Sequence, residues 1–147
     1  MIVLKQCIAS LLVILAVSAW AGNEGCTTGS EFEPPLCPIH LPKIRSVIVE
    51  ANAAKASAET DPSVDCSSFK LGERHVRRFL GRAKRVDAND AHHTLDWSAC
   101  HASGRITFAD GSSARWSIHK LRGGTLTPEG GAPIVLYCRD CGFKPFL

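Results

Sequence analysis

Residues 104–118, GRITFADGSSARWSI, carry the clearest structural pattern in the chain. Apolar and polar side chains alternate along it on both sides of the segment Ala109-Asp110-Gly111. Such alternation is typical of a strand with one buried face, and Gly within a short polar segment between two such runs is typical of a hairpin loop. We therefore predict two antiparallel strands joined at this segment.

The register of the hairpin follows from its apolar positions. A two-residue turn at Asp110-Gly111 would place Ile106 opposite Arg115, and that register is rejected because directly opposed residues share a sheet face. A three-residue loop instead places Gly111 at the left-handed position of a G1 bulge. The predicted pairs are Phe108 with Ser112, Ile106 with Ala114, and Gly104 with Trp116.

Other short runs with strand character flank the hairpin. Turns rich in Ser, Gly and Asp separate them. Together they predict an antiparallel meander of four to five short strands. The predicted strands are His92 to Trp97, Arg105 to Ala109, Ser113 to Lys120, a weaker one at Thr125 to Thr127, and Pro133 to Cys138.

A first amphipathic helix is predicted from Pro42 to Ala58. Apolar residues recur there at spacings of three and four, which is the helical period. Pro42 suits the first turn of a helix, and Asp61-Pro62 suits the region beyond its end.

A second amphipathic helix is predicted after Gly72, ending around Val86. With Gly72 as the N-cap, Leu71 and Val76 have the spacing of a hydrophobic staple. The expected fold class is α+β: two amphipathic helices, then the meander, with one helix stripe or both covering one sheet face.

The N-terminus has the three parts of a signal peptide. Lys5 precedes an apolar run from Ile8 to Trp20, and Ala19-Trp20-Ala21 is a small-x-small cleavage triplet. The run spans about 13 residues, whereas a bilayer-spanning helix needs roughly 20. We expect a signal peptide at residues 1–21, no lipid or stable membrane anchor after its cleavage, an irregular Pro- and Gly-containing arm at residues 22–41, and a single α+β domain at residues 42–147.

Six cysteines remain after the signal peptide, and in an exported protein an even number predicts disulfides. Six cysteines allow 15 pairings, which the sequence leaves open, although Cys26 and Cys37 are near enough to close a local loop. The expected set for three disulfides is Cys26, Cys37, Cys66, Cys100, Cys138 and Cys141.

The C-terminal pair Cys138-Arg139-Asp140-Cys141 also has the spacing of a redox or metal-binding motif. A thioredoxin-like pair lies at the start of a helix, whereas Pro145 interrupts the short segment that follows here. A zinc site would draw on Cys100, His101, Cys138 and Cys141, but a second paired motif is missing. His92 and His93, on a predicted strand, would point to opposite faces, so only one of them could add a ligand.

No coherent catalytic set is apparent. Cys100 beside His101 would be a candidate nucleophile and base, but neighbours on a strand do not face each other. A Gly-x-Ser-x-Gly elbow and Gly-rich nucleotide loops are lacking. We expect neither a catalytic centre nor a cofactor.

The second predicted helix is the most concentrated charge in the chain. Its basic side chains form a candidate surface for an acidic partner protein, and the alternative is an ordinary solvated face. The net charge of +3 falls to +2 without Lys5, so nothing in the overall charge favours nucleic acid. The candidate partner surface is Arg74, Arg77, Arg78, Arg82 and Arg85.

Several short patterns between Phe69 and Phe146 recur in order, among them Leu95-Asp96-Trp97-Ser98-x-Cys100, Phe108-x-Asp110-Gly111, Trp116-x-Ile118 and Leu136-Tyr137-Cys138-x-x-Cys141. This order resembles a family of small, signal-bearing proteobacterial proteins. The chain departs from that pattern at Gly72, where Thr or Ser would be the better N-cap. The resemblance implies a bacterial periplasmic setting and assigns no activity.

The expected function is a non-enzymatic binding module, periplasmic or secreted, of inhibitor or immunity type. Its expected partner is an acidic envelope protein or a delivered toxin, with no nucleic acid involved. The alternative is a periplasmic thiol-redox or metal-binding protein that uses Cys138 and Cys141.

Overall fold

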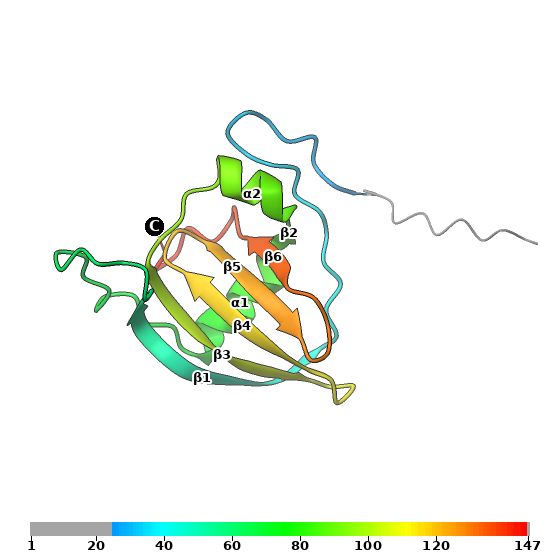
Figure 1. The fold of residues 1–147 in the computed structure, drawn as a ribbon. Coiled ribbons are helices and arrows are strands. Elements are labelled where there is room, and N and C mark those ends of the chain that lie inside the picture. The colour runs from blue at the N-terminus through cyan, green and yellow to red at the C-terminus, as the bar shows by residue number, and fades with distance from the viewer. Residues whose placement is uncertain (1–24, 147) are drawn as a thin grey trace, which may run out of the picture.

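The computed structural model describes residues 25–146, so the predicted signal peptide lies outside the described residues. The chain forms a six-stranded antiparallel sheet with the strand order β1-β3-β4-β5-β6-β2, and two helices (Figure 1). The α+β class is confirmed, although the sheet makes up most of the structure. The elements are β1 (Ile44–Lys55), α1 (Glu73–Arg82), β2 (Lys84–Arg85), α2 (Ala88–Thr94), β3 (Cys100–Phe108), β4 (Ser113–His119), β5 (Gly123–Pro128) and β6 (Ile134–Tyr137).

The hydrophobic core lies between the sheet and α1, which runs behind the sheet in Figure 1. Alternate residues of β3 and β4 are buried, as period-2 patterning requires. Trp116 fills the centre of this layer, and its indole Nε1 donates a hydrogen bond to the carbonyl of Arg105 at 3.2 Å. From α1 the buried side chains are Val76, Phe79 and Leu80.

The predicted hairpin is confirmed in register. Ile106 pairs with Ala114 and Gly104 with Trp116, and the amide of Phe108 donates to the carbonyl of Ser112 at 2.8 Å. Gly111 has a φ of 86°, the left-handed conformation that the G1 bulge requires. The later strands at β5 and β6 are confirmed as well.

The predicted first helix at Pro42 to Ala58 is wrong, because these residues form the edge strand β1. Its register against β3 shifts at three points, and each shift breaks the period of two. Because of these breaks, the apolar residues of this strand recur at spacings of three and four, which resemble the helical period. The density of β-branched side chains, with Ile44, Val47, Ile48 and Val49 in six residues, was the signal for a strand.

The second predicted helix is confirmed as α1, but it ends at Arg82. Ala83 is extended, with ψ of 148°, and Lys84–Arg85 continues as β2 beside β6. Gly72 is the N-cap as predicted, and the staple residues Leu71 and Val76 are both buried.

The predicted strand at His92 to Trp97 is also wrong. Residues 88–94 form α2, whose N-cap Asp87 accepts hydrogen bonds from the amides of Asn89 and Asp90. Because Asp is a preferred N-cap residue, Asp87 was the sequence signal for this helix.

The arm and the C-terminal segment both close onto the core. Residues 25–41 hold no helix or named strand, and Cys37 makes an isolated bridge to Arg85. At the other end, Phe146 lies 5.7 Å from Phe79 and 5.6 Å from Phe69 between ring centroids. The terminal Phe-Lys-Pro-Phe sequence thereby packs against the side of α1.

Candidate functional site

The six cysteines form three disulfides, as predicted: Cys26 with Cys37, Cys66 with Cys100, and Cys138 with Cys141. Cys138 and Cys141 are both 0 % exposed. Exchange with another thiol needs access to a sulfur, and burial denies this access to both residues in the folded chain. Three residues of the predicted zinc set, Cys100, Cys138 and Cys141, are thus in disulfides. Residues 25–146 bring together no group of three His, Cys, Asp or Glu that could hold a metal ion.

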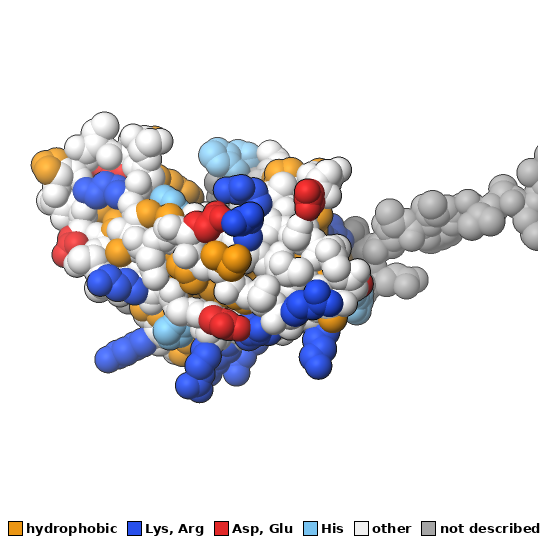
Figure 2. Space-filling view, turned by 90° about the horizontal axis from the view of Figure 1, so that it is seen from below, with side chains coloured by type: hydrophobic (Ala, Val, Ile, Leu, Met, Phe, Trp, Pro, Cys, Tyr) orange, Lys and Arg blue, Asp and Glu red, His pale blue; other side chains and the backbone are white. Residues whose placement is uncertain are grey.

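Three of the predicted arginines form a row on the outer face of α1. Arg74, Arg78 and Arg82 are spaced four residues apart and are exposed, opposite the apolar stripe of the helix. Figure 2 shows Lys and Arg side chains projecting along the lower edge of the molecule, on the side of the sheet where α1 lies. We call Arg74, Arg78 and Arg82 the arginine row.

Two members of the arginine row are held in place by the C-terminal segment. The guanidinium of Arg78 lies over the ring of Phe143, 3.9 Å from its centroid. Arg82 Nη1 donates to the carbonyl of Asp140 at 3.1 Å. A guanidinium has five N–H donors, so most donors of Arg82 stay available to a ligand.

The other two predicted arginines do not belong to this row. Arg77 donates to the carbonyls of Ile44 and Arg45, each at 3.0 Å, and pairs with Glu73 at 2.8 Å, so it ties α1 to β1. Arg85 lies on β2 and bridges to Cys37.

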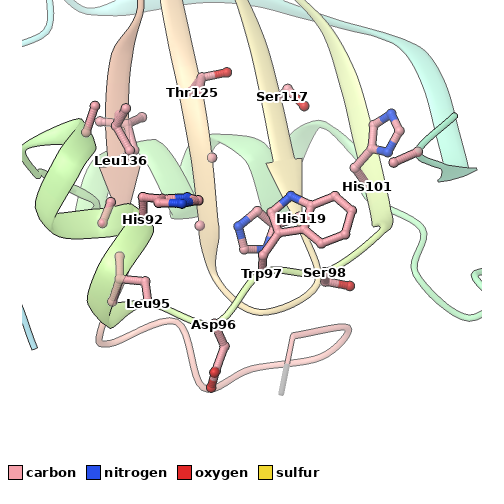
Figure 3. A pocket seen from close by; sticks show the side chains of 16 residues that line it. His92, Leu95, Asp96, Trp97, Ser98, His101, Ser117, His119, Thr125 and Leu136 are labelled. Atoms are coloured by element: carbon pink, nitrogen blue, oxygen red, sulfur yellow. The ribbon is translucent and has the colours of Figure 1, made fainter. Parts of the chain in front are cut away.

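A cleft of about 760 Å³ lies on the opposite face of the sheet, between α2 and the strands (Figure 3). Its floor comes from outward-facing residues of β3, β4 and β5, and its rim from α2 and the segment that follows it. The side chains central to it are His92, Trp97, Ser98, His101, Ser117, His119 and Thr125.

Two imidazoles lie side by side in the floor of the cleft. His101 pairs with His119 across β3 and β4. The amide of Lys120 bonds the carbonyl of Cys100, so this His pair occupies a non-hydrogen-bonded position, where opposed side chains come closest. Cys100 itself faces the core and is bonded to Cys66, whereas His101 lines the cleft.

His119 is the more enclosed of the two imidazoles. Burial, with a smaller contribution from nearby His101, lowers the pKa of His119 from 6.5 to about 4, so its ring is neutral near pH 7. Its buried Nδ1 finds no hydrogen-bond partner among residues 25–146. The ring packs on Gly123, where any Cβ would collide with Nε2.

Trp97 lies at the rim of the cleft and is 62 % exposed. It lies in the irregular segment between α2 and β3, and not on the strand predicted at His92 to Trp97. Figure 3 shows His92 extending from α2 towards the strands, whereas the Asp96 carboxylate points away from the cleft.

The cleft was not predicted from the sequence, although part of its signal was present. Extending the predicted hairpin register by three residues beyond the pair Gly104 and Trp116 places His101 opposite His119 on the outward face. The contribution of α2 to the cleft could not be predicted, because the sequence pattern indicates a strand at His92.

Comparisons of the chain with protein-family models, curated proteins and solved structures find no match. Of the two helices in the described part of the chain, neither has the length and apolar character to cross a membrane.

Proposed function

We propose that this protein is a non-enzymatic binding module, periplasmic or secreted, that captures an acidic protein through the arginine row of α1. The observation that carries the proposal is the fixed position of Arg78 and Arg82 on an otherwise exposed helix face. An inhibitor or immunity protein that neutralises an enzyme or a delivered toxin is the corresponding biological role.

Pre-organisation is the physical reason that this row suits a partner. Ordering a free, rotamer-rich side chain at an interface costs about 0.5–1.5 kcal/mol, and side chains that are already held avoid part of that cost. Arginine also presents a planar fork that matches carboxylates in two-point contacts. Glu73 does not neutralise the row, because its carboxylate is engaged by Arg77.

Export is supported by the disulfides together with the signal-like N-terminal sequence. Disulfides persist in the periplasm and outside the cell, where thiols are oxidised. The resemblance to signal-bearing proteobacterial proteins agrees with a periplasmic setting. The alternative role, thiol-redox or metal chemistry at Cys138 and Cys141, is disfavoured by the complete burial of both residues in one disulfide.

A charge-reversal experiment tests the proposal. The variant Arg74→Glu, Arg78→Glu, Arg82→Glu should lose capture of an acidic partner from an envelope extract, with the captured protein identified by mass spectrometry. Arg77 is left unchanged because it fastens α1 to β1. Wild-type capture should also weaken as salt rises, because exposed charge pairs are screened.

The matched control reverses three charges away from α1, in the variant Lys43→Glu, Arg115→Glu, Lys120→Glu. It changes net charge by the same amount and should capture the partner as the wild type does. Equal capture by wild type and the arginine-row variant would refute this docking surface. A toxin gene beside the gene for this chain would identify the partner to test first.

A further inference from the structure

We infer that the cleft between α2 and the open sheet face binds an uncharged saccharide of about two sugar rings. This site is separate from the proposed function, because the arginine row lies on the opposite side of the sheet. The proposal rests on the side chains gathered in the cleft, its size and the exposure of Trp97.

The polar groups in the cleft match ligand hydroxyls. Ser117 and Thr125 oppose each other across β4 and β5, and Ser98 lies at the rim. Each hydroxyl both donates and accepts a hydrogen bond, as does a neutral imidazole. Sugar hydroxyls have the same dual capacity, so they can satisfy such groups in several orientations.

The charges of the cleft favour a neutral ligand. No Lys or Arg is among the residues that line it within the described chain, and the one carboxylate, on Asp96, points away from the cavity. His119 is neutral near pH 7 because of its burial beside His101. A charged ligand would lose hydration here without gaining a fixed counter-ion, which is costly.

Trp97 supplies an apolar surface at the rim, and the cavity sets the ligand's size. Trp97 is 62 % exposed, so most of its indole surface is free to contact a ligand at the edge of the cleft. The carbon–hydrogen face of a sugar ring is flat and apolar and can bury the indole. A cleft of about 760 Å³ lies within the range of about 300–1,000 Å³ that holds drug-sized ligands.

The test is an NMR titration of the ¹⁵N-labelled full chain, purified with its disulfides intact. The probes are cellobiose, maltose and N,N′-diacetylchitobiose, with glucuronic acid, glucosamine and an N-acetylated dialanine amide as comparisons. At least one uncharged disaccharide should shift the Trp97 indole and the Ser117 and Thr125 amides saturably, with a Kd on the order of 1 mM or below.

Matched variants make the test specific. Trp97→Ala should weaken binding about tenfold or more, whereas Trp97→Phe, which keeps an aromatic surface, should stay within about threefold. Thr125→Val should weaken it without changing shape. Phe32→Ala, which removes an exposed aromatic outside the cleft, should have no effect. The dispersion of each spectrum shows whether the variant is folded.

Three results would overturn the inference: no saturable shift with any uncharged disaccharide, binding that survives in Trp97→Ala, or binding confined to the charged sugars or the peptide amide. None of them bears on the arginine row. Failure of partner capture likewise leaves the cleft untouched, so the two proposals fail separately.

Discussion

The two faces of the sheet are built from alternate residues of the same strands, yet they differ in what covers them. On one face, Ile106, Trp116 and Ile118 are packed against α1 and are at most 2 % exposed. On the other, the intervening positions carry His101, Ser117 and His119, and α2 covers only one end. The covered face is filled by close packing, whereas the open face leaves a cleft.

This difference separates stability from binding. A well-packed interior tolerates few changes, because added or removed atoms strain it or leave cavities. Side chains of the open face are only partly buried, so their identity can change to suit a ligand at little cost in stability. Substitutions on the covered face should therefore cost the most stability, and substitutions on the open face should alter binding or pH dependence.

The largest expected effect is removal of the disulfide that holds the segment before α1 to β3. The Cys66→Ala, Cys100→Ala variant opens a link spanning 34 residues and should lose about 4 kcal/mol of unfolding free energy. The Cys138→Ala, Cys141→Ala variant opens a span of 3 and should lose about 2 kcal/mol. Urea unfolding without reductant measures both, and equal losses would contradict the loop-length argument.

A smaller but still large loss is expected from Gly104→Ala on the covered face. A Cβ at Gly104 would collide with the carbonyl of Ile48 and lie 3.0 Å from Trp116. Because the obstacle is backbone of β1, the strand itself must shift, at a cost of about 2–3 kcal/mol. Gly142→Ala, where a Cβ meets no atom within 4 Å, is the control. A loss below about 0.5 kcal/mol in a urea melt would mean that β1 yields easily.

The open face should contribute a specific pH dependence through His119. Its folded pKa of about 4 lies below the ordinary 6.5, so between these values the unfolded chain binds a proton that the folded chain does not. Stability must then fall as pH drops from about 6.5 to 4, by about 2 kcal/mol at pH 5.

His119→Gln removes this titration and is the matched comparison. Asp61, Asp65 and Asp110, whose pKa values are lowered by hydrogen bonds to nearby serines, titrate in both proteins and cancel in the difference. The quantity to measure is the unfolding free energy at pH 7 and pH 5. If both proteins lose the same unfolding free energy between pH 7 and pH 5, His119 does not cause the pH dependence.

The smallest expected effect is a gain in stability at Gly81→Ala in α1. The residue is exposed, and a Cβ there would meet no atom within 4 Å. Alanine is favoured over glycine inside a helix by about 0.8–1 kcal/mol. Thermal unfolding should shift upward, and partner capture through the arginine row should be unchanged. A loss of stability would contradict the open space that the structure shows around Gly81.

Elements fixed by interactions between residues close in sequence were predicted correctly, and those fixed by distant residues were not. The hairpin at residues 104–118 was predicted in its register because one loop and two alternating runs fix it locally. β1 was misassigned because its three register shifts arise from pairing with β3, about 50 residues away. The arginine row was predicted only as part of a larger set that also held Arg77 and Arg85. Only the contacts of Arg77 with β1 and of Arg85 with Cys37 exclude these two residues from the row.

The hairpin, the helix α1 with its staple, the approximate positions of β5 and β6 and an even set of cysteines could all be predicted from the local sequence. These features follow from side-chain periodicity, turn chemistry and composition, which act over a few residues. Tertiary structure decided the disulfide partners, the strand at β1, the helix at α2 and the cleft beneath it. Each of these depends on which distant segments meet, and the free energy of those contacts overrides the weak local preferences of the residues involved.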